Sequence, residues 1–317
     1  MMFHIILLFL IKLNKKKYPM NFEETIKKYE KHRDKKIYAR KDKNPYESTI
    51  RGDSHRSFVF LPHETNKEKW CKNLFQYICN EIFINSTIDY YQGMTEIGAF
   101  IIYHYFNDSL SEQYDKISQE LLGSINSDEE EIEDFSGKKN SLVDENLSQY
   151  IDEEIYEKCI TAISNAIDDK FIPVVDNNFS LYDKYNNVFL RMMRNRNINI
   201  DLLLSKKYMN TTLSWFTRSV SHLEDTYKIL SLILESPTNV TFLLLVKYYD
   251  EIENGRKIED IPDDLPEELN KLQSEFAITE SEIARECNMP SKKILFGLGA
   301  AGVIIGIYLY QVFRKDK

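Results

Sequence analysis

Apolar residues recur every three or four positions along much of the chain, with polar and charged residues between them. One such stripe lies within residues 70–83 and consists of Trp70, Leu74, Tyr77, Ile78 and Ile82. Helical spacing returns in residues 151–167 and 177–208, and again in residues 213–249, where Ser236 and Pro237 interrupt it. Strand-type alternation is scarce. The pattern predicts an all-α fold with its main domain at residues 20–250.

One stretch inside this domain departs from the helical pattern. Residues 107–149 contain fewer apolar positions, and acidic residues are nearly contiguous between 128 and 134. Segments with low hydrophobicity and high charge bury too little apolar surface to offset the entropy of ordering. We therefore predict a disordered acidic insert at about 107–149, with a short helix at residues 114–122.

Residues 251–291 are polar, biased towards acidic side chains, and contain Pro262 and Pro266. This composition predicts a stalk between the domain and the C-terminal segment. Thr279 and Glu282 have the spacing of a capping box, which predicts a short helix that begins there and ends before Pro290.

The C-terminal segment predicts a membrane anchor. Residues 294–313, which begin with Ile294 and end with Phe313, contain no charge and a single amide. Twenty helical residues cover roughly 30 Å, the thickness of the hydrocarbon core. We expect a tail anchor at 292–317 with the domain in the cytosol; a buried core helix is the alternative. Gly302 and Gly306 have a spacing that could pair two such helices in a homodimer.

Residues 1–19 carry only a short apolar run, with no basic residues ahead of it and no small-residue cleavage site before the first lysines. The run is too short to cross a bilayer. We interpret it as a misassigned start, with Met20 opening the first charged helix. An interfacial helix is the other interpretation.

Composition and net charge exclude some classes of function. The chain has 317 residues, 43% of them apolar, which is enough for one sizeable core. Its formal net charge of −9 argues against a nucleic-acid partner, since phosphates are met by basic surfaces. The four cysteines lack the spacing of a zinc site, so we expect reduced thiols in a cytosolic domain.

Two short motifs carry candidate chemistry. The first, IRGDSHRSF at residues 50–58, contains Asp53 and Arg56; the second, YYQGM at residues 90–94, contains Gln92. Together they resemble the TBC domain of Rab GTPase-activating proteins, whose pattern is I-x-x-D-x-x-R-[T/S] followed some forty residues later by Y-x-Q-G-M. The segment SWFTR at residues 214–218 is similar to the later W-F region of an endoplasmic-reticulum branch that ends in a transmembrane tail.

The resemblance covers residues 50–106 and 171–250, and it implies a TBC-type helical domain that acts on a Rab-type GTPase of early secretory traffic. Arg56 and Gln92 would be catalytic in trans, as a pair of fingers. No cofactor would bind this chain, because GTP and Mg²⁺ belong to the partner, and the chain would catalyse no reaction of its own. The anchor would lie in the endoplasmic reticulum, with the mitochondrial outer membrane as an alternative.

The residue types suit this chemistry. Hydrolysis of GTP builds negative charge on phosphate oxygens, and a guanidinium is a planar, permanently charged donor for them. A carboxamide both donates and accepts hydrogen bonds, so Gln92 can orient the attacking water. Three further residues would support the pair: Asp53 by holding Arg56, Tyr91 by buttressing Gln92, and Gly93 by allowing close backbone approach.

Each motif also has a simpler interpretation. An Asp and an Arg three residues apart often form an ordinary surface ion pair, and YYQGM could be a loop that joins two helices. The Gly-rich start and the R-x-x-x-W helix usual in the family are absent upstream of Ile50, and Thr95 stands where many members have Asn. A catalytically inactive, membrane-anchored Rab-binding scaffold or tether is the alternative function. An anchored helical protein unrelated to GTPases is a further one.

Overall fold

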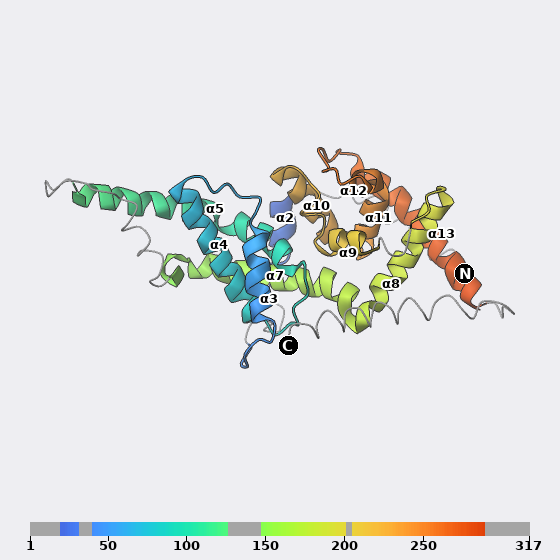
Figure 1. Cartoon of the computed structure of the whole chain (residues 1–317), viewed down its shortest axis with the longest axis horizontal. Helices are drawn as coiled ribbons and strands as arrows, with labels where there is room; N and C mark the ends of the chain where they lie inside the picture. Colours follow the sequence, from blue (N-terminus) through green and yellow to red (C-terminus); the bar gives the residue numbers. More distant parts are fainter. Residues whose placement is uncertain (1–19, 32–39, 126–146, 201–204, 289–317) are drawn as a thin grey trace. The chain divides into compact units, whose positions relative to one another are not determined.

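The computed structural model describes residues 20–31, 40–125, 147–200 and 205–288 (Figure 1). Every regular element within these ranges is a helix, and the strand-type pairing found there is one isolated parallel bridge between Val220 and Ile258. The prediction of an all-α fold is confirmed for this part of the chain. The chain divides into two compact units, Met1–Phe276 and Ala277–Lys317.

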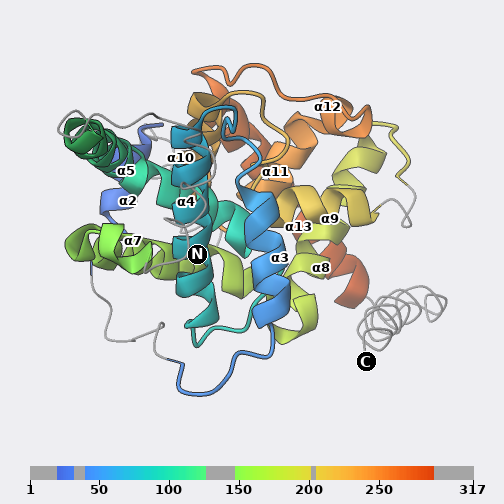
Figure 2. The same ribbon diagram turned by 60° about the vertical axis from the view of Figure 1, so that its left-hand side comes forward.

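The first helices of the larger unit are α2 (Phe22–Lys27), α3 (Glu47–Ser57), α4 (Asn66–Ile84) and α5 (Met94–Ile125). Helix α4 begins with a capping box, in which Thr65 accepts from the backbone N–H of Glu68 and the Glu68 carboxylate accepts from that of Thr65. Helices α3, α4 and α5 pack against one another, and α3 and α4 lie side by side in Figures 1 and 2.

Aromatic packing fixes the end of α3. Phe58 is fully buried and stacks on Phe75 of α4, with ring centroids 5.8 Å apart. Phe60 stacks on Phe100 of α5 at 4.2 Å. A fully buried Phe side chain contributes about 1.5–3 kcal/mol. These contacts hold the last turn of α3, which carries Arg56, at a defined position on α4 and α5.

The next helices are η1 (Leu147–Tyr150), α7 (Glu153–Ala166), a π-helical turn η2 (Ile167–Phe171) and α8 (Ile172–Asn195). Helix α8 is broken near its start. Asp176 is extended there (ψ 167°), and Asn177, Asn178 and Phe179 follow with φ of 50°, 56° and 62°. Asn tolerates this left-handed region but Phe adopts it rarely, so the surrounding structure must impose the break.

The chain continues through α9 (Ser205–Leu213), α10 (Leu223–Glu235), α11 (Val240–Lys247) and α12 (Tyr249–Glu253). The predicted interruption at residues 236–237 is confirmed, because α10 ends at Ser236 in extended backbone. Residues 214–222, expected to be helical, instead form turns in which Trp215 and Phe216 have φ of 49° and 63°.

Part of the segment expected to be an acidic insert is helical. Helix α5 continues to Ile125, so the disorder predicted for residues 107–113 and 123–125 is wrong, whereas the helix expected at residues 114–122 is present as part of α5. Phe106 and Leu110 are fully buried, and Tyr114 packs on Trp70 with centroids 5.6 Å apart. This sparse stripe at a spacing of four residues is enough to hold the helix on α4. Residues 126–146 lie outside the described residues.

The expected stalk is also different. A single helix, α13 (Leu265–Asn288), occupies most of residues 251–291, and Thr279 lies inside it instead of opening a new helix. Leu265, Leu269 and Phe276 are buried in the larger unit. Residues 265–276 are therefore part of the folded domain and not a spacer, because their apolar side chains face a packed surface.

None of the helices in the described ranges combines the length and apolar character needed to cross a bilayer. The predicted anchor at 294–313, with Gly302 and Gly306, lies outside the described residues, as does the segment 1–19. Both stay predictions from the sequence.

Candidate functional site

Arg56 lies in the last turn of α3 with 60% of its side chain exposed. Its Nη2 donates to Asp53 Oδ1, one helical turn earlier, and the Asp53 side chain is only 5% exposed. The expected pairing of Asp53 with Arg56 is thus present, and it differs from an ordinary surface pair because the carboxylate is buried.

Asp53 has a second partner that sequence reasoning missed. The hydroxyl of Tyr90 donates to Asp53 Oδ2 at 2.7 Å and lies 3.1 Å from Thr95 Oγ1. Burial raises the pKa of Tyr90 above its ordinary value, so this hydroxyl stays protonated and remains a donor. The bond joins Asp53 of α3 to Tyr90, which lies two residues before Gln92. Its sequence signal was the first Tyr of the YYQGM motif.

Gln92 is exposed, in the turn that leads into α5. Its neighbour Gly93 has φ of +109°, and a Cβ there would lie 2.6 Å from the backbone oxygen of Leu213 at the end of α9. Any other residue would be both strained and overlapped with backbone. The close approach expected of Gly93 is present, and the structure shows that it is made to the protein's own α9.

Tyr91 is half-buried, and its ring lies against two aromatic residues of the η2–α8 segment. The centroid distances are 6.5 Å to Phe171 and 5.9 Å to Phe179. Phe179 belongs to the left-handed break of α8, so this strained segment supports the turn that carries Gln92. Phe171 in turn contacts Trp215 at 6.5 Å.

A second arginine and carboxylate lie in the same region, and neither was among the predicted site residues. Arg218, in the turn after α9, pairs with Glu96 in the first turn of α5. Arg218 is 52% exposed and the Glu96 side chain 6%. The pKa of Glu96 is raised overall, mainly because the carboxyl group is buried. The nearby charge of Asp53 also raises this pKa, and the charges of Arg218 and Arg56 offset part of the rise. The sequence signals were the SWFTR segment, which ends at Arg218, and a lone carboxylate in the apolar run after Gln92.

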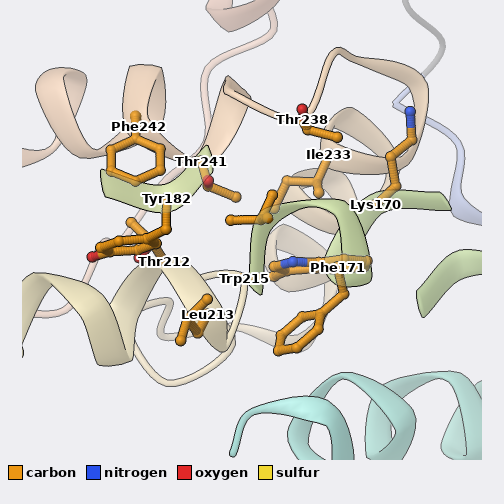
Figure 3. A pocket seen from close by; sticks show the side chains of 11 residues that line it. Lys170, Phe171, Tyr182, Thr212, Leu213, Trp215, Ile233, Thr238, Thr241 and Phe242 are labelled. Carbon is orange, nitrogen blue, oxygen red and sulfur yellow. The ribbon is translucent and has the colours of Figure 1, made fainter. Parts of the chain in front are cut away.

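The cavity of the larger unit shown in Figure 3 borders the candidate site, since Phe171, which lies against Tyr91, and Leu213, which lies against Gly93, are among its lining residues. It holds about 10 Å³, and Phe171, Trp215 and Tyr182 are among the side chains around it, with Lys170 and Thr238 at one end (Figure 3). None of the predicted site residues lines it. It has room for little more than a water molecule, and the side chains of Arg56 and Gln92 are exposed outside it.

Comparison with known proteins adds one relative. An uncharacterized membrane protein of Encephalitozoon cuniculi is 27% identical over 308 residues, which cover 94% of this chain and 99% of that protein. No family profile matches the chain, and no solved structure is significantly similar to it.

Proposed function

We propose that this chain is a GTPase-activating protein for Rab-type small GTPases, and that it supplies Arg56 and Gln92 to the partner's nucleotide site. One observation carries the proposal. Arg56 is an exposed guanidinium held by a buried carboxylate, and that carboxylate is bonded to Tyr90, two residues before an exposed glutamine.

The chemistry of this arrangement suits phosphoryl transfer from GTP to water. A positioned arginine that neutralises charge on the phosphates is worth about 10³–10⁵-fold in rate. Asp53 limits the conformations of Arg56 before the partner arrives, so less side-chain entropy is lost on insertion. Gln92, on a turn fixed by Gly93 and Tyr91, would orient the attacking water. GTP and Mg²⁺ would come with the partner.

The test is single-turnover GTP hydrolysis on a panel of Rab GTPases, with the full chain in detergent micelles. Wild type should accelerate hydrolysis by at least one of them. Arg56→Ala should reduce that acceleration by about 10³–10⁵-fold, and Gln92→Ala by about 10²–10³-fold. Arg51→Ala is the matched control, because Arg51 is exposed on the same helix and pairs with Glu47 at 2.9 Å.

Two results would contradict the proposal. Full stimulation of GTP hydrolysis by both Arg56→Ala and Gln92→Ala would exclude the catalytic roles assigned to the two residues. Binding of GTP-loaded Rab by wild type without faster hydrolysis would identify the chain as a scaffold or tether instead.

We further propose that residues 294–313 anchor the chain in a membrane with the domain in the cytosol, at the endoplasmic reticulum. The uncharged segment supports this, and so does the relative from Encephalitozoon cuniculi, which is described as a membrane protein and matches almost end to end. Replacing Val303 and Ile304 by Arg places two charges at the centre of the segment, each costing about 2.5–3.5 kcal/mol there.

This double variant should be extracted by alkaline carbonate, whereas wild type should stay with the membrane fraction. Extraction of both proteins would refute the anchor. Imaging of the fluorescent full chain would decide between the endoplasmic reticulum and the mitochondrial outer membrane.

A further inference from the structure

Arg218 has the same kind of environment as Arg56. In both pairs an exposed guanidinium is bonded to a carboxylate that is almost entirely buried. Burial of a carboxylate disfavours its charged form, and the bonded guanidinium offsets part of that cost. Since apolar residues in place of such a pair often stabilise a fold at least as well, stability alone does not account for it. What it does achieve is to hold a charged, solvent-facing group in one place.

The backbone around Arg218 is fixed as well. Trp215 and Phe216 precede it in the left-handed region, which side chains of this size adopt only where the fold imposes it. The carbonyl oxygen of Arg218 accepts a bond from Lys257 Nζ. One residue later, the oxygen of Ser219 accepts from the N–H of Ile258 at 2.7 Å. The turn that carries Arg218 is thus held by the segment that contains Lys257 and Ile258.

Arg218 also belongs to the same neighbourhood as the two proposed fingers. Its partner Glu96 lies one turn after Gly93 and is influenced by the charges of Asp53 and Arg56. The end of α9, which leads into the Arg218 turn, approaches Gly93 so closely that a Cβ would lie 2.6 Å from Leu213 O. The two arginine–carboxylate pairs are thus close enough for their charges to interact, and the Arg218 turn follows the segment that packs against Gly93.

We propose that Arg218 is a specificity-determining residue, whose guanidinium binds a surface carboxylate of the GTPase partner. This inference rests on the proposed function. Stimulated GTP hydrolysis needs one added guanidinium at the phosphates, and Arg56 fills that role. The described bond of Arg218 to Glu96 uses one nitrogen, Nη2, and a guanidinium has further donors whose planar geometry matches a carboxylate. A contact of this kind acts on encounter and affinity and leaves the hydrolysis step unchanged.

The experiment measures KM and kcat for stimulated hydrolysis of the GTP-loaded Rab that wild type accelerates most, with the full chain in detergent micelles. Arg218→Ala should raise KM at least tenfold and change kcat less than threefold. It should also weaken the salt dependence of kcat/KM, because a charged contact is lost. Arg218→Glu should raise KM further. Arg51→Ala should alter neither constant.

Arg218→Ala leaves Glu96 buried without its partner and could unfold the protein. The double variant Glu96→Gln with Arg218→Ala removes the uncompensated charge, and it should keep the raised KM. Glu96→Gln alone retains the guanidinium but loosens it, so KM should rise by less than it does in Arg218→Ala.

The outcomes separate the two proposals. If wild type stimulates hydrolysis and the double variant has an unchanged KM, this inference is wrong and the proposed function stands. If the double variant instead loses kcat as Arg56→Ala does, Arg218 acts at the phosphates and the assignment to a surface carboxylate is wrong. If wild type neither binds nor stimulates any Rab, the proposed function fails and this inference fails with it.

Discussion

Replacing Gly93 by Ala perturbs the candidate site at the point where two segments approach most closely. The added Cβ would lie 2.6 Å from Leu213 O, 3.0 Å from Leu213 C and 3.4 Å from Ser214 N. All three are backbone atoms, which cannot turn away as the end of a flexible side chain can. The φ of +109° also lies in a region that L-residues rarely adopt.

Gly255 offers a matched control. It too has a positive φ, +67°, but a Cβ there would meet nothing within 4 Å. Gly255→Ala should therefore cost only the left-handed strain, about 1–2 kcal/mol, partly offset by about 0.4–1 kcal/mol from the less flexible unfolded chain. Gly93→Ala should cost about 1–3 kcal/mol in backbone strain at positive φ. The overlap of the new Cβ with the Leu213 backbone should cost about 1–3 kcal/mol more. We expect the two losses to differ by about 2–3 kcal/mol.

The assay is urea unfolding of the full chain in detergent micelles, followed by tryptophan fluorescence. The chain has two tryptophans, and Trp215 lies next to Ser214, so a Trp70→Phe background makes the signal local to the site. Equal losses of unfolding free energy in the two glycine variants would refute the close-approach argument. So would a Gly93→Ala protein that unfolds like wild type.

Three further predictions concern buried polar groups. Tyr90→Phe removes a donor from Asp53 and should lower the free energy of unfolding by about 1–2 kcal/mol in the same assay, with a smaller loss in Thr95→Ala. Burial lowers the pKa of His104, so the unfolded chain binds its proton more readily and stability should fall as pH drops below about 6.5; His104→Phe should flatten that part of the pH–stability profile, and an unchanged slope would contradict the assignment. Burial raises the pKa of Cys79 to about 12 and that of Cys159 well above its ordinary value, so both thiols should resist a disulfide reagent at pH 8 until urea unfolds the chain.

The helical spacing of apolar residues was sufficient to predict the helices whose apolar faces are most deeply buried. The stripe on residues 70–83 forms α4, and the interruption at residues 236–237 separates α10 from α11. It failed where a helix has a narrow apolar face. Phe106, Leu110 and Tyr114 were too sparse to outweigh the polar residues between them, so only a short helix at residues 114–122 was predicted and the continuity of α5 to Ile125 was missed. Residues 265–276 were assigned to a stalk for the same reason, because three buried side chains suffice when a packed surface already exists.

In the candidate site, too, some contacts follow from the sequence and others only from the tertiary structure. Asp53 and Arg56 are three residues apart, so helix geometry alone brings them together, and the sequence determined that pair. Sequence also determined the types of group available, a guanidinium and a carboxamide. Tertiary structure alone decided that Tyr90 bonds Asp53 and that Gly93 meets Leu213. It alone decided that Arg218 pairs with Glu96, 122 positions earlier. Such contacts depend on how helices pack, and no local rule of spacing encodes them.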